Sequence, residues 1–163
     1  MTTPRPIRLL FVCMGNICRS PAGECLFRAH VERQGTVDRF EIDSAGTTGY
    51  HVGEPPDRRM AAAARSRGYN LSGAARQVSA RDLDHYDLIL AMDDANLRDM
   101  RRLDRDGSRA HKIKLMLDFH PTRAGADVPD PYYGGDAGFQ EVIDLIEASC
   151  PALHDFALRE LPT

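Results

Sequence analysis

A cysteine and an arginine near the N-terminus are separated by five residues, as in a loop that binds phosphate. Residues 12–21 read VCMGNICRSP and contain Cys13 and Arg19. A loop of this length can curl around a phosphate dianion and direct its backbone N–H groups at the oxygens, and Gly15 permits the tight curve. Arg19 offers two phosphoryl oxygens a planar fork of donors. Because helix N-termini and nearby cations favour ionised thiols, we expect Cys13 to be a thiolate at neutral pH.

Two other phosphate-binding loops fit this segment poorly. The nucleotide-binding loop G-x-x-x-x-G-K-S/T requires a lysine, which residues 12–21 lack. The dinucleotide-binding loop requires a glycine triplet, which is also missing. A structural cysteine beside a surface arginine is the ordinary alternative. The order strand, glycine, arginine, serine and helix favours a phosphate loop with a built-in nucleophile instead.

The segments around this loop alternate between predicted strands and helices. A nearly continuous apolar run predicts a strand at residues 7–12, and further strands are predicted at residues 40–44, 88–92 and 112–117. Helical spacing predicts helices at residues 20–34, 55–67, 95–103 and 139–161. Gly35 and Gly68 are placed to end the first two helices, and Pro151 predicts a kink or a break in the last. This alternation indicates a parallel sheet, with the ligand site beyond the carboxyl ends of its strands, where the loop begins.

Composition indicates one globular domain spanning residues 1–163. The chain has 42% apolar and 28% charged residues, which suffices for one sizeable core. No apolar stretch is long enough to cross a bilayer, and no signal peptide is recognisable, so the sequence predicts a cytoplasmic protein without a membrane partner. Export without a signal peptide stays open. A net charge of -3 gives no reason to expect a nucleic-acid partner.

The cysteines and histidines show no spacing typical of metal ligands. Four cysteines without a Cys-x-x-Cys pair predict neither a zinc site nor a disulfide framework, which fits a reducing compartment; they are Cys13, Cys18, Cys25 and Cys150. All six histidines are predicted to be structural or solvated; they are His30, His51, His85, His111, His120 and His154. The sequence therefore predicts no metal and no cofactor.

Cleavage of a phosphate ester also needs a proton donor for the leaving oxygen, which the loop does not supply. Asp130 lies in a long polar loop after the fourth predicted strand, between Pro129 and Pro131. The prolines stiffen this segment, and it should reach the same edge of the sheet as the loop. By residue type alone, an ordinary turn aspartate is equally compatible with this position.

Several motifs together resemble the low-molecular-weight protein tyrosine phosphatase family, from residue 7 to about residue 161. Besides the cysteine loop, five segments occur in the family order: DSAGT at 43–47, PPDRR at 55–59, ARQ at 75–77, MDDANLR at 92–98 and DPYYG at 130–134. The resemblance implies a four-stranded parallel sheet of order 2-1-3-4 with helices on both faces. This is the flavodoxin-like, phosphotyrosine phosphatase I-like α/β fold.

The resemblance also implies hydrolysis of phosphotyrosine and aryl phosphate monoesters through a cysteinyl-phosphate intermediate. Cys13 would attack phosphorus, Arg19 would bind the phosphoryl oxygens, and Asp130 would be the acid and then the base. Phosphotyrosine-containing proteins would be the substrates, and phosphate or other oxyanions would occupy the site. The implied substrate-binding residues are Met14, Gly15, Asn16, Ile17, Cys18, Ser20, Tyr50, Tyr132 and Tyr133. Ser44 and Asp93 would support the loop.

One departure and two alternative functions remain. Gly73 stands where the family commonly has a histidine that donates to the loop asparagine, so the network around Asn16 is expected to be one partner short unless a water replaces it. An arsenate reductase on the same fold is an alternative, although the chain lacks the close downstream cysteine pair of that family. A non-catalytic phosphotyrosine-binding or redox-sensing module is another, and the combination of Cys13, Arg19 and Asp130 argues against it.

Overall fold

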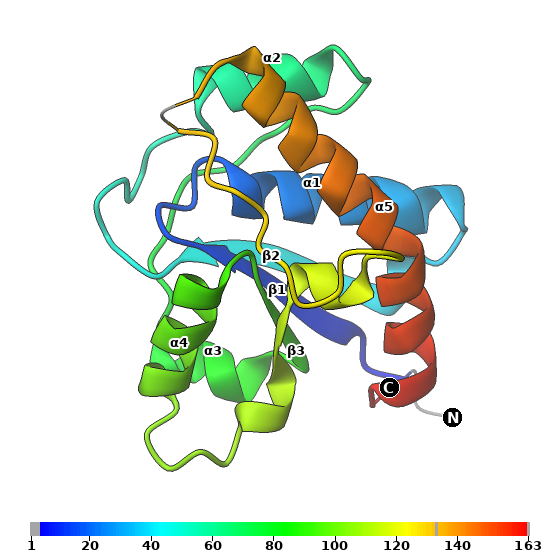
Figure 1. Cartoon of the computed structure of the whole chain (residues 1–163). Helices are drawn as coiled ribbons and strands as arrows, with labels where there is room; N and C mark the ends of the chain where they lie inside the picture. Colours follow the sequence, from blue (N-terminus) through cyan, green and yellow to red (C-terminus); the bar gives the residue numbers. More distant parts are fainter. Residues whose placement is uncertain (1–3, 133, 163) are drawn as a thin grey trace.

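Four parallel strands form one sheet in the order β2-β1-β3-β4, as predicted (Figure 1). The computed structural model describes residues 4–132 and 134–162. The strands are β1 (Ile7–Cys13), β2 (Phe40–Gly46), β3 (Leu88–Ala91) and β4 (Ile113–Leu115). β1 pairs with β2 along its whole length and with β3 on its other side. The strand order reverses beside β1, so the segment that follows Cys13 starts at the switch point of the sheet.

Helices cover both faces of this sheet. Figure 1 shows α1 (Arg19–Arg33) and α5 (Asp136–Glu160) on one face, with α2 (Arg58–Arg65) packed against α5, and α3 (Ala80–His85) and α4 (Asp94–Leu103) on the other. Along β1, Leu9 and Phe11 belong to the core under α1 and α5, whereas Leu10 and Val12 belong to the core under α3 and α4. All four side chains are fully buried, which explains the continuous apolar sequence of this strand.

Three helix ends follow from local chemistry. Gly35 and Gly68 have φ angles of 74° and 88° and directly follow the last turns of α1 and α2, as predicted. The predicted start of α2 at residue 55 is wrong, because the helix begins at Arg58. The Asp57 side chain accepts the N–H groups of Arg59 and Met60, so this residue caps the helix and the two prolines before it lie outside.

Two predictions around the second half of the sheet are corrected by the structure. The fourth strand ends at Leu115 rather than at residue 117, because the chain turns into a 3₁₀ helix, η3 (Met116–Phe119). The Asp118 carboxylate accepts the Leu115 N–H at 3.2 Å and stabilises this turn. The helix α3 was not predicted; its first turn is held by the Asp82 carboxylate, which accepts the Ser79 N–H at 2.8 Å. Two further 3₁₀ turns are η1 (Val37–Arg39) and η2 (Ala110–Lys112).

The last helix, α5, continues through Pro151 instead of breaking there. Figure 1 shows the helix changing direction toward its red, C-terminal part, so the predicted kink is confirmed and the predicted break is wrong. Ser149 Oγ donates to the Leu145 carbonyl at 2.8 Å, and Cys150 Sγ donates to the Ile146 carbonyl at 3.3 Å. Such bonds from side chains to the preceding turn often accompany helix bends.

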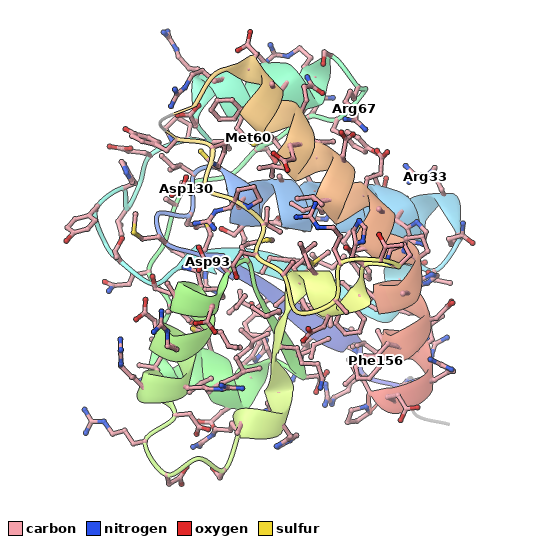
Figure 2. The ribbon with its side chains drawn as sticks, in the orientation of Figure 1. Arg33, Met60, Arg67, Asp93, Asp130 and Phe156 are labelled. Carbon is pink, nitrogen blue, oxygen red and sulfur yellow. The ribbon has the colours of Figure 1, made fainter. Side chains whose placement is uncertain are left out.

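The aromatic contacts between α1 and the sheet predict a large effect of Phe27→Ala. The Phe27 ring is fully buried, with its centroid 5.9 Å from that of Phe11 and 5.3 Å from that of Phe40. We expect a loss of about 3–5 kcal/mol in the free energy of unfolding, measured by urea denaturation. Phe156→Ala, which truncates a partly buried ring near the end of α5 (Figure 2), is the control and should cost clearly less. Equal losses in the two variants would contradict this ranking.

Candidate active site

The loop between β1 and α1 is anchored through its carbonyl groups. The Cys13 and Met14 carbonyls accept the N–H groups of the two threonines after β2, at 2.9 and 3.0 Å, and the Ile17 carbonyl accepts the Asp57 N–H at 2.8 Å. Among the described parts of the chain, no acceptor takes an N–H group of residues 14–18. These donors are therefore left for a ligand, as an anion-binding loop requires.

The Cys13 sulfur is held at the start of α1 by Ser20. Sγ lies 3.0 Å from Ser20 Oγ, and the Ser20 N–H donates to it at 3.4 Å. The Asn16 amide donates to Ser20 Oγ at 2.8 Å and to Ser44 Oγ at 3.0 Å. Because Ser20 Oγ accepts from Asn16, its own proton can be donated to the sulfur. The structure thus brings together Cys13 and the three polar side chains that were predicted to surround it.

The Asn16 amide is hydrogen-bonded through both its nitrogen and its oxygen. Its Oδ1 accepts the backbone N–H of Arg76 at 3.0 Å, and its φ angle of 59° places it in the left-handed region. Ser44 in turn donates to Glu24 at 2.8 Å. Both ends of the Asn16 amide therefore have protein partners, and Oδ1 has one donor for its two lone pairs. The expectation that the network is one partner short at Gly73 stays a prediction.

Arg19 is almost fully buried, and its guanidinium contacts two aspartates. Nη1 lies 2.6 Å from Asp93 Oδ2 and donates to the Val128 carbonyl at 3.0 Å, while Nη2 lies 3.6 Å from Asp130 Oδ2. Burial alone lowers the pKa of Arg19, but the charges of Cys13, Asp93 and Asp130 raise it by more, so the side chain stays charged. Asp93 also caps α4, and Figure 2 shows both aspartates near the start of α1.

One cavity of about 290 Å³ opens at this edge of the sheet. Asp130 reaches it from the loop before α5, and its Oδ1 accepts the N–H of Tyr132 at 3.0 Å, which orients the carboxylate. Asn16 and Ser20 support the loop without lining the cavity. The lining residues are Cys13, Met14, Gly15, Ile17, Cys18, Arg19, Tyr50, His51, Asp130 and Tyr132.

The walls of the cavity are aromatic. Tyr50 is 80% exposed at the rim, and Tyr132 lies opposite His51 with 6.4 Å between the ring centroids. His51 was predicted to be structural or solvated, so its place in this wall was missed; its only sequence signal is that it follows Tyr50. The Glu54 carboxylate lies 2.7 Å from His51 Nδ1 and orients the ring. The third predicted aromatic position, Tyr133, lies outside the described residues.

The second cysteine of the cavity is Cys18. Cys18 is buried, and burial raises the pKa of its thiol, with further contributions from the negative charges of Asp57, Cys13 and Asp130. Cys18 is therefore protonated at neutral pH. Its thiol cannot compete as a nucleophile under these conditions.

Within residues 4–132 and 134–162, no group of three or more histidine, cysteine or acidic side chains is arranged to hold a metal ion. The described helices also include none that is long and apolar enough to cross a membrane.

The loop between β1 and α1 carries a cysteine and a buried arginine at the switch point of a four-stranded parallel sheet. These features define an α/β protein with a phosphate-type loop that contains a cysteine. Comparison with known proteins identifies the family within this class. Residues 8–161 match the family described as low molecular weight phosphotyrosine protein phosphatase. The chain therefore belongs to this family.

Relatives from distant organisms agree over nearly their whole length. A low molecular weight protein-tyrosine-phosphatase of Streptomyces coelicolor is 46% identical, with 90% of each chain covered. The human low molecular weight phosphotyrosine protein phosphatase is 39% identical, with 88% of this chain and 91% of the human protein covered. The crystal structure of a protein tyrosine phosphatase from Entamoeba histolytica superposes with a TM-score of 0.87 at 42% identity, covering 92% of this chain and 96% of that one.

The hydrogen bonds of Asn16 predict that Asn16→Ala destabilises the protein by about 2 kcal/mol or more. The substitution leaves buried donors and acceptors without partners, each costing about 1–3 kcal/mol, and places alanine at a strained φ angle. Urea denaturation measures the loss. Asn70→Ala, at an exposed position, is the control and should change stability by less than about 0.5 kcal/mol. If the two variants are equally stable, the network does not hold the loop.

Proposed function

We propose that this protein hydrolyses phosphotyrosine in protein substrates, and aryl phosphates in general, with Cys13 as nucleophile. The single observation that carries the proposal is the meeting of Cys13, Arg19 and Asp130 in one aromatic-walled cavity. Cys13 and Arg19 come from the two ends of one loop, and Asp130 comes from the distant loop before α5. Together they supply a nucleophile, a cation for the phosphoryl oxygens and a proton donor for the leaving group.

In the first step, the Cys13 thiolate attacks phosphorus in line with the bond to the aryl oxygen. The phosphorus–oxygen bond breaks, its electron pair leaves on the phenolate, and Asp130 donates a proton to that oxygen. The Arg19 nitrogen that faces Asp130 and the unbonded N–H groups of residues 14–18 stabilise the charge on the three remaining oxygens. The product of this step is a cysteinyl-phosphate.

In the second step, water replaces the phenol. Asp130, now ionised, takes a proton from the water as its oxygen attacks phosphorus, and the phosphorus–sulfur bond breaks. Inorganic phosphate forms and the Cys13 thiolate returns, stabilised by the hydroxyl and N–H groups of Ser20. One carboxyl group thus serves as acid and then as base.

The shape of the cavity favours an aromatic phosphate ester. Tyr50, His51 and Tyr132 can flank a phenyl ring, which a phosphoserine side chain is too short to present between them. Phosphotyrosine proteins are therefore the proposed substrates, and phosphate the proposed oxyanion. The four free cysteines support a reducing, cytoplasmic location, and the two cores sharing one sheet support a single domain.

The roles of Cys13 and Arg19 predict severe losses from small changes. Cys13→Ser should reduce p-nitrophenyl phosphate turnover to background while inorganic phosphate still binds, because the loop donors and Arg19 remain.

Arg19→Lys should lower kcat by about 10²–10³-fold, because an ammonium group cannot bind two oxygens as a fork. Steady-state kinetics and isothermal titration with phosphate measure both effects. Cys25→Ser, outside the cavity, is the control. Substantial turnover by Cys13→Ser would refute the proposed nucleophile. An assay of thioredoxin-dependent arsenate reduction would then test the alternative function, an arsenate reductase.

The role of Asp130 predicts that Asp130→Asn acts according to the leaving group. Phosphorylation of Cys13 should slow by about 10²–10⁴-fold with poor leaving groups such as alkyl phosphates, and by less with nitrophenyl esters, which leave without a proton. Pre-steady-state rates plotted against the pKa of the leaving group measure this difference. Asp99→Asn, on the exposed surface of α4, is the matched control. An equal fractional loss across the whole series would mean that Asp130 has only a structural role.

A further inference from the structure

A second cavity of about 520 Å³ adjoins the catalytic one. The two cavities share Ile17, His51 and Tyr132 as walls, so a ligand that fills the first continues directly over the second. The rest of the second cavity is formed by residues 54–59, which run from the segment after His51 into the first turn of α2. The mechanism uses none of these six residues, and two of them are arginines.

Both carboxylates of this cavity already have partners. Glu54 lies 2.7 Å from the His51 ring nitrogen. Asp57 accepts the N–H groups of Arg59 and Met60 at the start of α2 and lies 3.3 Å from the Arg59 guanidinium. Burial raises the pKa of Asp57, but these hydrogen bonds lower it by more, so Asp57 remains a charged cap that is paired with Arg59.

The two arginines are in different situations. Arg59 is paired with Asp57, and its guanidinium lies 5.3 Å from the ring centroid of Tyr132 and 4.9 Å from that of Phe139. Arg58 is exposed, and no carboxylate of residues 4–132 or 134–162 forms an ion pair with it. Of the two arginines in this cavity, Arg58 is therefore the one whose guanidinium has no carboxylate partner among the described residues and can pair with an acidic group of a ligand.

We propose that the second cavity is a subsite for an acidic side chain of the substrate, located two residues from the phosphotyrosine and recognised by Arg58. In an extended peptide, side chains two positions apart point to the same side and are about 7 Å apart. When the phosphotyrosine fills the catalytic cavity, such a side chain faces the neighbouring one. This inference rests on the proposed function and adds the class of substrate, an acidic phosphotyrosine sequence.

The test uses phosphotyrosine peptides that differ only in glutamate, alanine or lysine, two residues before or after the phosphotyrosine. For the native protein, kcat/KM should be about two- to fivefold higher with glutamate than with alanine at one of these positions, as for an exposed ion pair, and lower with lysine. This ratio should fall toward one in about 0.5 M salt. Arg58→Ala should bring it to about one, and Arg58→Glu should favour lysine instead.

Matched controls separate this charge from the general effects of substitution. Arg58 is the first residue of α2, where glutamate is favourable, so both variants should fold. Arg101→Ala removes another exposed arginine, near the end of α4, and should keep the native ratio. A native ratio of one, or an unchanged ratio in Arg58→Ala, overturns the subsite while hydrolysis of p-nitrophenyl phosphate leaves the proposed function standing. Failure of the native protein to hydrolyse every substrate overturns both.

Discussion

The active-site edge of this molecule depends on how the positive charge of Arg19 is buried. A guanidinium with 3% of its surface exposed costs several kcal/mol unless it is paired and hydrogen-bonded. Asp93 provides the pairing from the end of β3, and the Val128 carbonyl provides a further acceptor from the loop before α5. The ion pair therefore joins the phosphate loop, α4 and the Asp130 segment. The second guanidinium nitrogen, Nη2, lies 3.6 Å from Asp130 Oδ2, and both residues line the cavity.

Asn16 provides the corresponding support on the opposite side of the loop. Its amide connects the Ser20 hydroxyl beside the sulfur to Ser44 on β2 and, through Oδ1, to the backbone at Arg76. The loop is thus held by an ion pair on one side and by neutral hydrogen bonds on the other, while its own N–H groups stay unbonded. Such a preorganised set of donors needs little rearrangement when negative charge arrives.

The sequence predicts most of the fold and the centre of the site because their signals are local. The nearly continuous apolar runs of β1 and β3 identify the centre of the sheet, and the spacing of Cys13 and Arg19 identifies the loop. The sequence is least informative where single contacts decide the structure, whether these are distant or local in the chain. The partner of Asn16 Oδ1 is a backbone N–H, which any residue at position 76 would supply, so residue types cannot reveal it. His51 becomes part of the wall only because Tyr132 folds against it from the far end of the chain. Residues 116 and 117 have a strand-like sequence, but β4 ends before them because the Asp118 carboxylate accepts the Leu115 N–H and stabilises a turn.

The central position of β1 has a consequence for the protein during its synthesis. Alternate side chains of this strand belong to two different cores, and its neighbours β2 and β3 come later in the chain. When Cys13 leaves the ribosome, neither face of its strand can yet be covered, and neither partner of Arg19 has been made. Until those segments follow, Cys13 lacks the packed surroundings that bury it in the folded protein. It enters its final environment only after residues 88–93 have joined the sheet.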